Sequence, residues 1–228
     1  MYTYDRSKIT IIVPAKNEGA GLHKIIKSVK PYGRDVIVVD GHSCDNTKKI
    51  VEKEKVRYIL DNGLGRGDGL RMGIAAAHNE VLVFFDADGS HNERDIPILL
   101  KAIFTNKADL VISSRKTGGS FDLESSLSAI IRSTGSDLLT YLINKKFAAH
   151  LSDILFSFRA IKKSVAQEIS LQSNGFAIEQ EMVVSCLKHG YTIQEIPIRE
   201  KKRAWGDSKL KTRTGIVLAI DLIKQLYF

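Results

Sequence analysis

The chain has 228 residues, of which 43% are hydrophobic, and a formal net charge of +8. This composition excludes a largely disordered chain, and no apolar run reaches the roughly 18 residues that a membrane-spanning helix needs. The positive charge indicates an anionic partner, which leaves nucleotides, nucleic acids and acidic lipids open. The two cysteines, Cys44 and Cys186, lack the spacing of a metal site, and their small number favours a reducing compartment.

Strands and helices alternate through the first half of the chain. Apolar runs predict strands over residues 9–13, 35–40, 56–60, 81–85 and 109–113, and helical periodicity predicts helices over 22–29, 46–53 and 69–78. This order predicts an α/β fold with a mainly parallel sheet, helices on both faces and strand ends that meet at one crevice. In the second half we expect a loop over 115–120, helices over 127–143 and 177–189, a strand and turn within 152–162, and a strand over 191–199.

The fourth predicted strand ends in two carboxylates, Asp86 and Asp88, which are separated by one alanine. Ligands of open α/β sheets bind at the carboxyl ends of strands. Because residues i and i+2 of an extended chain point to the same side, both carboxylates can approach one hard cation, Mg²⁺ or Mn²⁺, which would carry a phosphate. The alternative interpretation is a strand-end turn, since Asp and Gly are common in turns.

Polar or turn-forming residues also follow the first two predicted strands, at residues 14–18 and 40–47. Together with Asp86 and Asp88, and with the later segments 195–198 and 203–210, they give the chain a resemblance to the family 2 glycosyltransferases. Within that family it resembles the dolichol-phosphate mannosyltransferase branch. The resemblance extends from about residue 9 to 210. It implies a GT-A, Rossmann-like catalytic domain over residues 1–210, which an amphipathic helix over 211–228 would follow.

The resemblance also implies a donor side. Residues that bind the nucleotide sugar would be Pro14, Ala15, Asn17, Glu18, Asp40, Arg66 and Asp86, and Asp86 and Asp88 would hold the metal. A cation that bridges the donor diphosphate would neutralise the charge on the departing nucleotide. Asp40 is placed near the base or ribose. The alternatives are an acid near a helix N-terminus for Asp40, a solvated loop charge for Glu18 and a flexible surface loop around Arg66.

The acceptor side is implied in the same way. Residues that bind an acceptor phosphate would be Arg115, Arg132, Ser136, Arg203, Ser208 and Lys209. The planar fork of arginine suits phosphate, and Arg132 and Ser136 lie one helical turn apart. Solvated surface charges are the alternative for the arginines. Glu179 and Glu181 match an acidic position of the family, unless they are exposed helix acids. We interpret His91 as a loop residue.

The predicted catalytic residues are Asp88 and Asp153. A phosphate acceptor with a second pKa of about 6 is largely ionised near neutrality and needs little help from a base. A hydroxyl acceptor needs a general base, and Asp153 is the first candidate. The family has a compact Ser-Gly-Phe-Arg after this acid, whereas Phe156 and Ser157 stand here in place of the Ser and Gly.

The predicted function is the inverting, metal-dependent transfer of mannose or glucose from GDP-mannose or UDP-glucose to a polyprenyl or dolichyl phosphate. Inversion follows from the family resemblance. One alternative is transfer to a sugar hydroxyl in polysaccharide or glycolipid assembly. A second alternative, from another class, is a non-catalytic nucleotide-binding module. No nucleic-acid motif is present, and we expect no nucleic-acid partner.

The C-terminal segment predicts attachment to a membrane surface. From Ile216 onward its apolar residues fall on one helical face, and basic residues lie just before that stretch, as in helices that lie on anionic lipids. The apolar residues are Ile216, Ile220, Ile223 and Tyr227, and the basic ones are Lys209, Lys211 and Arg213. A terminal helix packed on the core is the alternative. Because residues 1–6 also lack the apolar run of a signal peptide, we expect a cytoplasmic protein, peripheral on the cytoplasmic face of the membrane.

Overall fold

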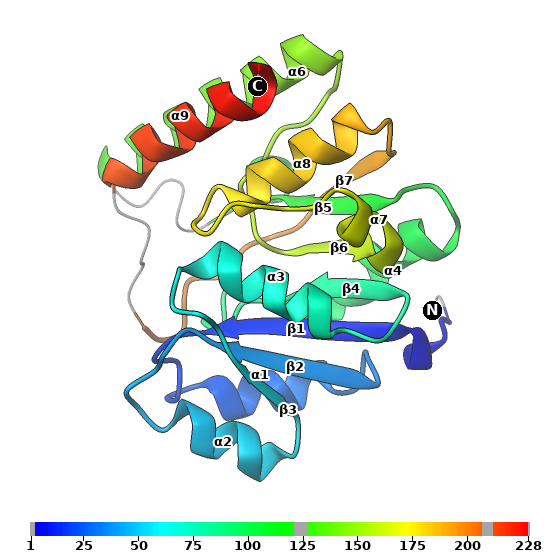
Figure 1. Cartoon of the computed structure of the whole chain (residues 1–228), viewed down its shortest axis with the longest axis vertical. Coiled ribbons are helices and arrows are strands. Elements are labelled where there is room, and N and C mark those ends of the chain that lie inside the picture. The colour runs from blue at the N-terminus through cyan, green and yellow to red at the C-terminus, as the bar shows by residue number, and fades with distance from the viewer. Residues whose placement is uncertain (1–2, 121–126, 207–211, 228) are drawn as a thin grey trace.

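The computed structural model describes residues 3–120, 127–206 and 212–227. This part of the chain forms one seven-stranded sheet in the order β3-β2-β1-β4-β6-β5-β7 (Figure 1). The strands are β1 (Ile9–Ala15), β2 (Asp35–Asp40), β3 (Arg57–Leu60), β4 (Val81–Phe84), β5 (Leu110–Ser114), β6 (Arg159–Lys162) and β7 (Ile193–Pro197). Only the pairs that β6 makes with β4 and β5 are antiparallel in this sheet. The predicted mainly parallel α/β sheet is therefore confirmed.

Helices cover both faces of the sheet, because both faces of its central strands are apolar. The helices are α1 (Leu22–Val29), α2 (Thr47–Glu54), α3 (Arg66–Ala76), α4 (Ile96–Phe104), α5 (Arg115–Gly118), α6 (Leu127–Phe147), α7 (Lys163–Glu168), α8 (Ile178–Lys188) and α9 (Thr212–Tyr227). In β1, Ile9, Ile11 and Val13 face one core with α1, α2 and α4, whereas Ile12 faces the other core with α3, α6, α7, α8 and α9. Short 3₁₀ turns are η1 (Arg6–Lys8) and η2 (Glu93–Asp95).

Several elements differ from the sequence expectations. The expected loop over 115–120 begins as the short helix α5, because the side chain of Ser114 caps it by accepting a hydrogen bond from the Thr117 N–H. Helix α4 was not expected, although a proline stands in its first turn and Ile96, Leu99 and Ile103 are buried at helical spacing. The expected strand within 152–162 is only the four residues of β6.

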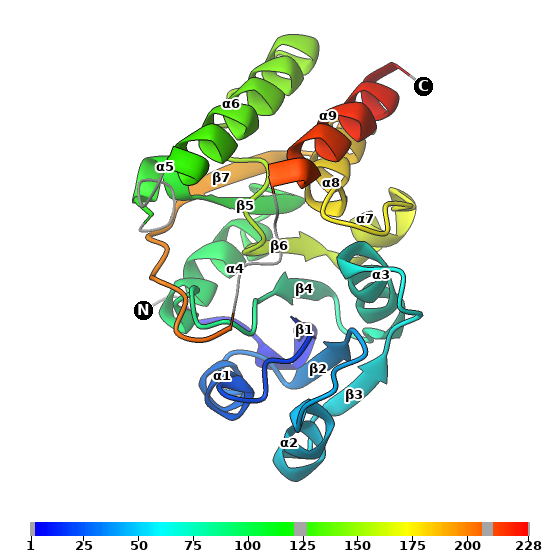
Figure 2. The ribbon, with the colours of Figure 1, turned by 90° about the vertical axis from the view of Figure 1, so that its left-hand side faces the viewer.

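Helices α6 and α9 lie side by side over α8, at the end of the molecule away from α1 and α2 (Figures 1 and 2). Helix α9 packs against the core through Leu218, Leu222 and Leu226, which share one helical face and are all buried. Among the helices that the structure describes, none combines the length and apolar character needed to cross a membrane. The face of α9 opposite these leucines points away from the core.

Candidate functional site

A cavity of about 430 Å³ lies at the carboxyl edge of the sheet, where β1 to β5 end. Its lining comes from residues at or just after the ends of these strands, from the start of α3, from α5, α6, α8 and α9, and from loops at residues 155–157, 176 and 200–203. The predicted site residues that line it are Pro14, Ala15, Glu18, Arg66, Asp86, Asp88, Arg115, Ser136 and Arg203. Asn17, Asp40 and Asp153 are not among the lining residues. Ser208 and Lys209 lie outside the described residues, and Arg132 is in α6 with an undescribed side chain.

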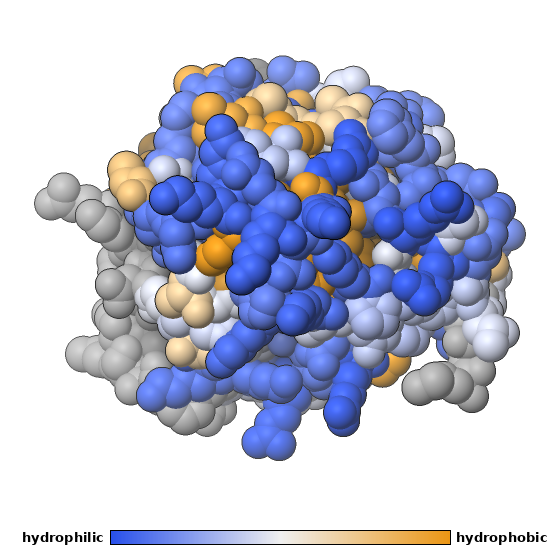
Figure 3. Space-filling model, turned by 90° about the horizontal axis from the view of Figure 1, so that it is seen from below, coloured by the Kyte–Doolittle hydropathy of each residue, from blue (hydrophilic) through white to orange (hydrophobic). Residues whose placement is uncertain are grey.

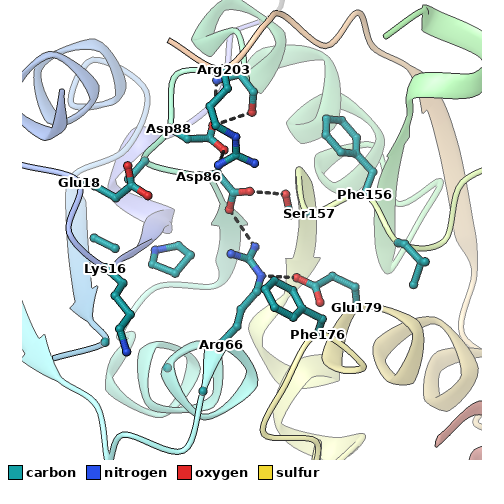
Figure 4. Close-up of a pocket in the computed structure, with 18 of the residues that line it drawn as sticks. Lys16, Glu18, Arg66, Asp86, Asp88, Phe156, Ser157, Phe176, Glu179 and Arg203 are labelled. Carbon is teal, nitrogen blue, oxygen red and sulfur yellow. Dashed lines mark hydrogen bonds and ion pairs between the residues drawn. The ribbon is translucent and has the colours of Figure 1, made fainter. Parts of the chain in front are cut away.

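Asp86 is held from two sides (Figure 4). The guanidinium of Arg66 donates from Nη2 to Asp86 Oδ1 at 2.8 Å and from Nε to Glu179 Oε1 at 2.6 Å. The Ser157 hydroxyl donates to Asp86 Oδ2 at 2.6 Å. Burial alone would raise the pKa of Asp86, but the charge of Arg66 and the hydrogen bonds from Arg66 and Ser157 hold that pKa well below its usual range. Asp86 is thus an oriented carboxylate, and Arg66 connects it both to α3 and, through Glu179, to α8.

His91 holds the backbone of Asp86 in place. It lies in a loop, but it is only 3% exposed, and its ring packs on Phe85, Phe156 and Phe158. The backbone N–H of Asp86 donates to His91 Nδ1 at 3.1 Å, so Nδ1 carries no proton. Burial lowers the pKa of His91 in spite of the nearby Asp86 charge. A neutral ring therefore fixes the turn that carries Asp86.

Asp88 is paired with Arg203, which the family resemblance assigns to the acceptor side. Arg203 Nη1 lies 2.6 Å from Asp88 Oδ2, and Asp88 Oδ1 accepts from the N–H and hydroxyl of Ser90 at 2.9 and 2.7 Å. The segment around Arg203 is docked on this turn, because Ala204 N–H donates to the Asp88 carbonyl and Trp205 Nε1 to the Ala87 carbonyl, both at 2.9 Å. A cation bound at Asp88 would compete with the Arg203 guanidinium.

The carboxylate oxygens at this wall suit a divalent cation that is shared with a diphosphate. Asp86 and Asp88 offer hard carboxylate oxygens at one cavity wall. Over residues 3–120, 127–206 and 212–227, no group of three or more His, Cys, Asp or Glu side chains could hold a metal ion by itself. Mg²⁺ is commonly bound by one or two carboxylates together with substrate phosphates. The two aspartates fit that mode of binding, and a dedicated protein cage is absent from the described residues.

Two predicted donor residues lie beside the cavity and support its walls. Asp40 Oδ2 accepts from the Tyr58 hydroxyl at 2.8 Å, and burial together with this bond raises the pKa of Tyr58 to about 12. Asn17 has a φ of 57° and joins the loops after β1 and β2. Its side-chain oxygen accepts from the Cys44 N–H at 2.8 Å, and its N–H donates to Ser43 Oγ at 2.7 Å. Both residues therefore shape the donor wall from outside.

On the acceptor side, Arg115 and Asp153 bind each other. Arg115 Nε and Nη2 lie 2.8 and 3.2 Å from the two Asp153 carboxylate oxygens, and Asp153 is fully buried. The Arg115 guanidinium also lies over the Phe156 ring, 4.7 Å from its centroid. Asp153 thus fixes the position of Arg115 in the cavity wall. This carboxylate has no open access to a substrate hydroxyl.

Helix α6 contributes hydroxyl groups to the same wall. Ser136 is buried, and its Oγ has no hydrogen-bond partner among the described residues. Ser133 also lines the cavity and accepts a hydrogen bond from Lys116 Nζ at 2.6 Å. A buried hydroxyl without a protein partner is unfavourable unless a ligand or water completes it. This wall of the cavity, which the family resemblance assigns to the acceptor, therefore combines cations with hydroxyl groups.

Some lining residues had not been predicted. Asp61 directly follows β3, and the strand-end pattern that marked Asp40 and Asp86 would have found it. Ser157 and Phe176 come from loops whose place beside the cavity depends on packing between distant segments, so no local pattern marks them. Glu179 and Glu181 are buried rather than exposed helix acids. Glu181 accepts from the N–H groups of residues 172 and 173 at 2.8 Å and so shapes the loop before α8.

Residues 10–170 of the chain match the family described as Glycosyl transferase family 2. The chain belongs to this family. It is 29% identical over 232 residues to the uncharacterized protein MJ1222 of Methanocaldococcus jannaschii, covering 98% of this chain and 94% of that protein. It is 26% identical over 225 residues to the glycosyltransferase AglJ of Haloferax volcanii, covering 95% of this chain and 71% of AglJ.

Solved structures confirm the predicted GT-A fold. Glucosyl-3-phosphoglycerate synthase from Mycobacterium tuberculosis, in complex with Mn²⁺, UDP and glucosyl-3-phosphoglycerate, superposes with a TM-score of 0.76 at 18% identity. The match covers 96% of this chain and 80% of that one. The Mg²⁺ and UDP complex of the same synthase gives a TM-score of 0.77. The present chain is thus a family 2 glycosyltransferase.

Proposed function

We propose that this glycosyltransferase transfers a hexose from a nucleoside diphosphate sugar to a polyprenyl phosphate, with inversion and with a divalent cation, as in the dolichol-phosphate mannosyltransferase branch. One observation carries the proposal. The cavity that contains Asp86 and Asp88 extends to Ser136 of α6 and Leu218 of α9. The outer faces of these same two helices carry most of the exposed large apolar side chains of the described chain. A phosphate site therefore adjoins a surface suited to lipid.

The donor end supports the use of a sugar nucleotide. Glycine-rich backbone at the start of α3 and the N-terminus of that helix border the cavity, and such termini favour phosphate. A divalent cation held by Asp86 and Asp88 would neutralise charge on the departing diphosphate. Arg66 orients Asp86, and Ser90 orients Asp88. The related synthase binds UDP with Mn²⁺ or Mg²⁺.

The acceptor wall favours a nucleophile that is already ionised. Asp153, the first candidate for a general base, is fully buried and paired with Arg115. A phosphate monoester with a second pKa of about 6 attacks without prior deprotonation near neutral pH. Arg115 and the hydroxyl groups of Ser133 and Ser136 would bind its oxygens and direct one of them to the anomeric carbon.

The outer surface of α6 and α9 supports membrane attachment. Eight of the eleven large apolar side chains that are exposed in the described chain belong to these two helices. They are Leu138, Tyr141, Leu142, Ile216, Val217, Ile220, Ile223 and Tyr227, and we call this set the apolar face. Exposed apolar patches of this kind mark interaction surfaces. Lys145, Lys146 and Lys224 are exposed on the same helices and would attract anionic lipid headgroups.

Transfer to the hydroxyl of a small phosphorylated acceptor is a second candidate. The solved synthase has structures with phosphoglyceric acid and with glycerol 3-phosphate, so its fold accommodates such acceptors. The cations and hydroxyls of the present cavity would also bind their phosphate. The buried Arg115–Asp153 pair and the apolar face favour the lipid phosphate instead.

A matrix of donors and acceptors tests the proposal. Purified protein is incubated with Mn²⁺ or Mg²⁺ and with labelled GDP-mannose or UDP-glucose. The acceptors are a polyprenyl phosphate in detergent, the corresponding polyprenol, and glycerol 3-phosphate. We expect labelled glycolipid with the polyprenyl phosphate and none with the polyprenol, which has the same chain but no phosphate. Transfer to glycerol 3-phosphate with none to the polyprenyl phosphate would replace the proposal by the second candidate.

A further inference from the structure

Two neighbouring carboxylates at the ends of β2 and β3 face different surroundings. Asp40 ends β2, and Asp61 follows β3, with the Asp61 N–H donating to the Asp40 carbonyl at 3.0 Å. Asp61 lines the cavity together with Lys16, Val39 and Gly41, whereas Asp40 does not line it. The donor nucleotide would therefore meet Asp61, although the family resemblance assigns the base or ribose to Asp40.

The partners of Asp40 explain why it does not face the cavity. Its Oδ2 accepts from the Tyr58 hydroxyl at 2.8 Å, and its Oδ1 accepts from the N–H and hydroxyl of Ser43 at 3.0 and 2.5 Å. The residue is only 2% exposed. Both oxygens thus serve to join β2 to β3 and to the loop after β2. Asp40 has the arrangement of a structural carboxylate.

Asp61 is fixed with its carboxylate in the cavity wall. Its Oδ1 accepts from the Gly63 N–H at 2.8 Å, and its carbonyl oxygen lies 2.9 Å from His42 Nε2. Gly69 lines the cavity beside it, and a Cβ built there would stand 3.3 Å from Asp61 Oδ2. The absence of a side chain at Gly69 leaves room next to this carboxylate. The α3 N-terminus, where phosphate is favoured, begins five residues later at Arg66.

We propose that Asp61 selects the base of the donor nucleotide and that it favours uracil or guanine; this inference rests on the proposed use of a nucleoside diphosphate sugar. A carboxylate only accepts hydrogen bonds. Uracil and guanine carry an N–H within the pyrimidine ring that can donate to it. Cytosine and adenine carry an unprotonated ring nitrogen at the equivalent edge, and its lone pair would face the carboxylate. Sites built to bind a donor group discriminate strongly against analogues that lack it.

Binding of the free nucleoside diphosphates tests this assignment separately from sugar transfer. Calorimetric titrations with UDP, GDP, CDP and ADP in the presence of Mn²⁺ are made on the wild type, Asp61→Asn and Asp40→Asn. We expect the wild type to bind UDP or GDP more tightly than CDP and ADP. Asp61→Asn should weaken binding of the preferred nucleotide by about 10-fold or more. It should also reduce the difference in affinity between that nucleotide and CDP or ADP, because the amide can donate as well as accept a hydrogen bond. Asp40→Asn should lower the melting temperature and leave the order of the bases unchanged.

Inorganic pyrophosphate with Mn²⁺ serves as the control for folding, because it occupies the phosphate end and carries no base. Asp61→Asn should bind it as the wild type does. If Asp61→Asn keeps the wild-type base order, or if Asp40→Asn abolishes that order, the assignment to Asp61 is wrong while the transfer reaction can stand. If the wild type binds pyrophosphate but discriminates among none of the four bases, Asp61 is not a selecting residue. Failure of the wild type to bind any nucleotide contradicts the use of a sugar nucleotide itself.

Discussion

The donor and acceptor halves of the cavity are built from different kinds of structure. The donor half consists of residues at or just after the ends of β1 to β4 and at the start of α3. The end of the molecule near α1 and α2 has a mainly hydrophilic surface with small apolar groups (Figure 3). The acceptor half is formed by α5, α6 and α9, and the outer faces of α6 and α9 are apolar. In the proposed function, the first half would bind the water-soluble nucleotide. The second half would bind the acceptor phosphate next to a surface suited to lipid.

The largest effect is expected at the boundary between the halves, where Asp88 lies. Asp88→Ala should lower transfer by about 10²–10³-fold, because the diphosphate loses the cation that stabilises its developing charge. It should also weaken Mn²⁺ binding, measured by electron paramagnetic resonance in the presence of a nucleoside diphosphate. Asp95→Asn, which removes a carboxylate outside the cavity lining, is the matched control. Unchanged Mn²⁺ binding in Asp88→Ala would exclude Asp88 as a metal ligand.

Arg115 tests the acceptor half, and its partner must be treated with it. Arg115→Ala alone leaves Asp153 buried without its cation and should lower the free energy of unfolding by about 3–5 kcal/mol. The double variant Arg115→Ala/Asp153→Asn should recover much of that stability in denaturant titrations. It should still use the acceptor phosphate about 10- to 100-fold less well, because the charge-assisted contact is absent.

Nucleoside diphosphate affinity is the control for that double variant, since Arg115 lies in the acceptor half. An equal loss of donor and acceptor binding would mean that Arg115 does not distinguish the two halves. Recovery of acceptor use together with stability would show that Arg115 serves only to neutralise Asp153.

Arg203 should give effects of opposite sign in the two halves. Its guanidinium neutralises Asp88 in this structure, so Arg203→Gln should increase Mn²⁺ affinity by a few-fold. The same variant should weaken use of a phosphate acceptor. Mn²⁺ titrations and acceptor kinetics on one preparation provide both readings. A fall in Mn²⁺ affinity would show that Arg203 supports the cation site and does not compete with it.

The two halves also differ in how far the sequence predicted them. The fold, and the lining positions of Asp86 and Asp88, follow from apolar strands whose ends carry turn-forming or charged residues, and the family resemblance adds Pro14 and Ala15. Those patterns are local, and the parallel order of the strands brings their ends together. The family resemblance places Asp40 near the base or ribose, but neither the resemblance nor a strand end indicates which neighbours bind its carboxylate oxygens. Only the structure shows Tyr58 and Ser43 on that carboxylate.

The acceptor half depends on contacts between distant segments. Nothing local to Asp153 indicates that Arg115, 38 residues earlier, binds it. The sequence left open whether the C-terminal helix packs on the core or faces outward. Leu218, Leu222 and Leu226 form its buried face, while Ile216, Ile220, Ile223 and Tyr227 stay exposed on the other. A helix with one apolar face on the core and another exposed has apolar residues at helical spacing in either case. Composition and periodicity therefore do not distinguish a core-packed helix from one that lies on a membrane.

The most direct test of the account compares a vesicle-borne acceptor with a soluble one. Transfer rates are measured for a long polyprenyl phosphate in anionic vesicles and for a short, water-soluble isoprenyl phosphate. The variants are Ile220→Glu/Ile223→Glu on the apolar face and Ile98→Glu, a similarly exposed isoleucine on α4. We predict that the transfer rate of the double variant with vesicles falls by at least about 10-fold, because charges replace two apolar contacts with lipid. Its transfer rate with the soluble acceptor should stay unchanged. Ile98→Glu should behave as the wild type with both. Equal rates of the wild type and the double variant on vesicles, or no transfer by the wild type to either phosphate, would contradict the account.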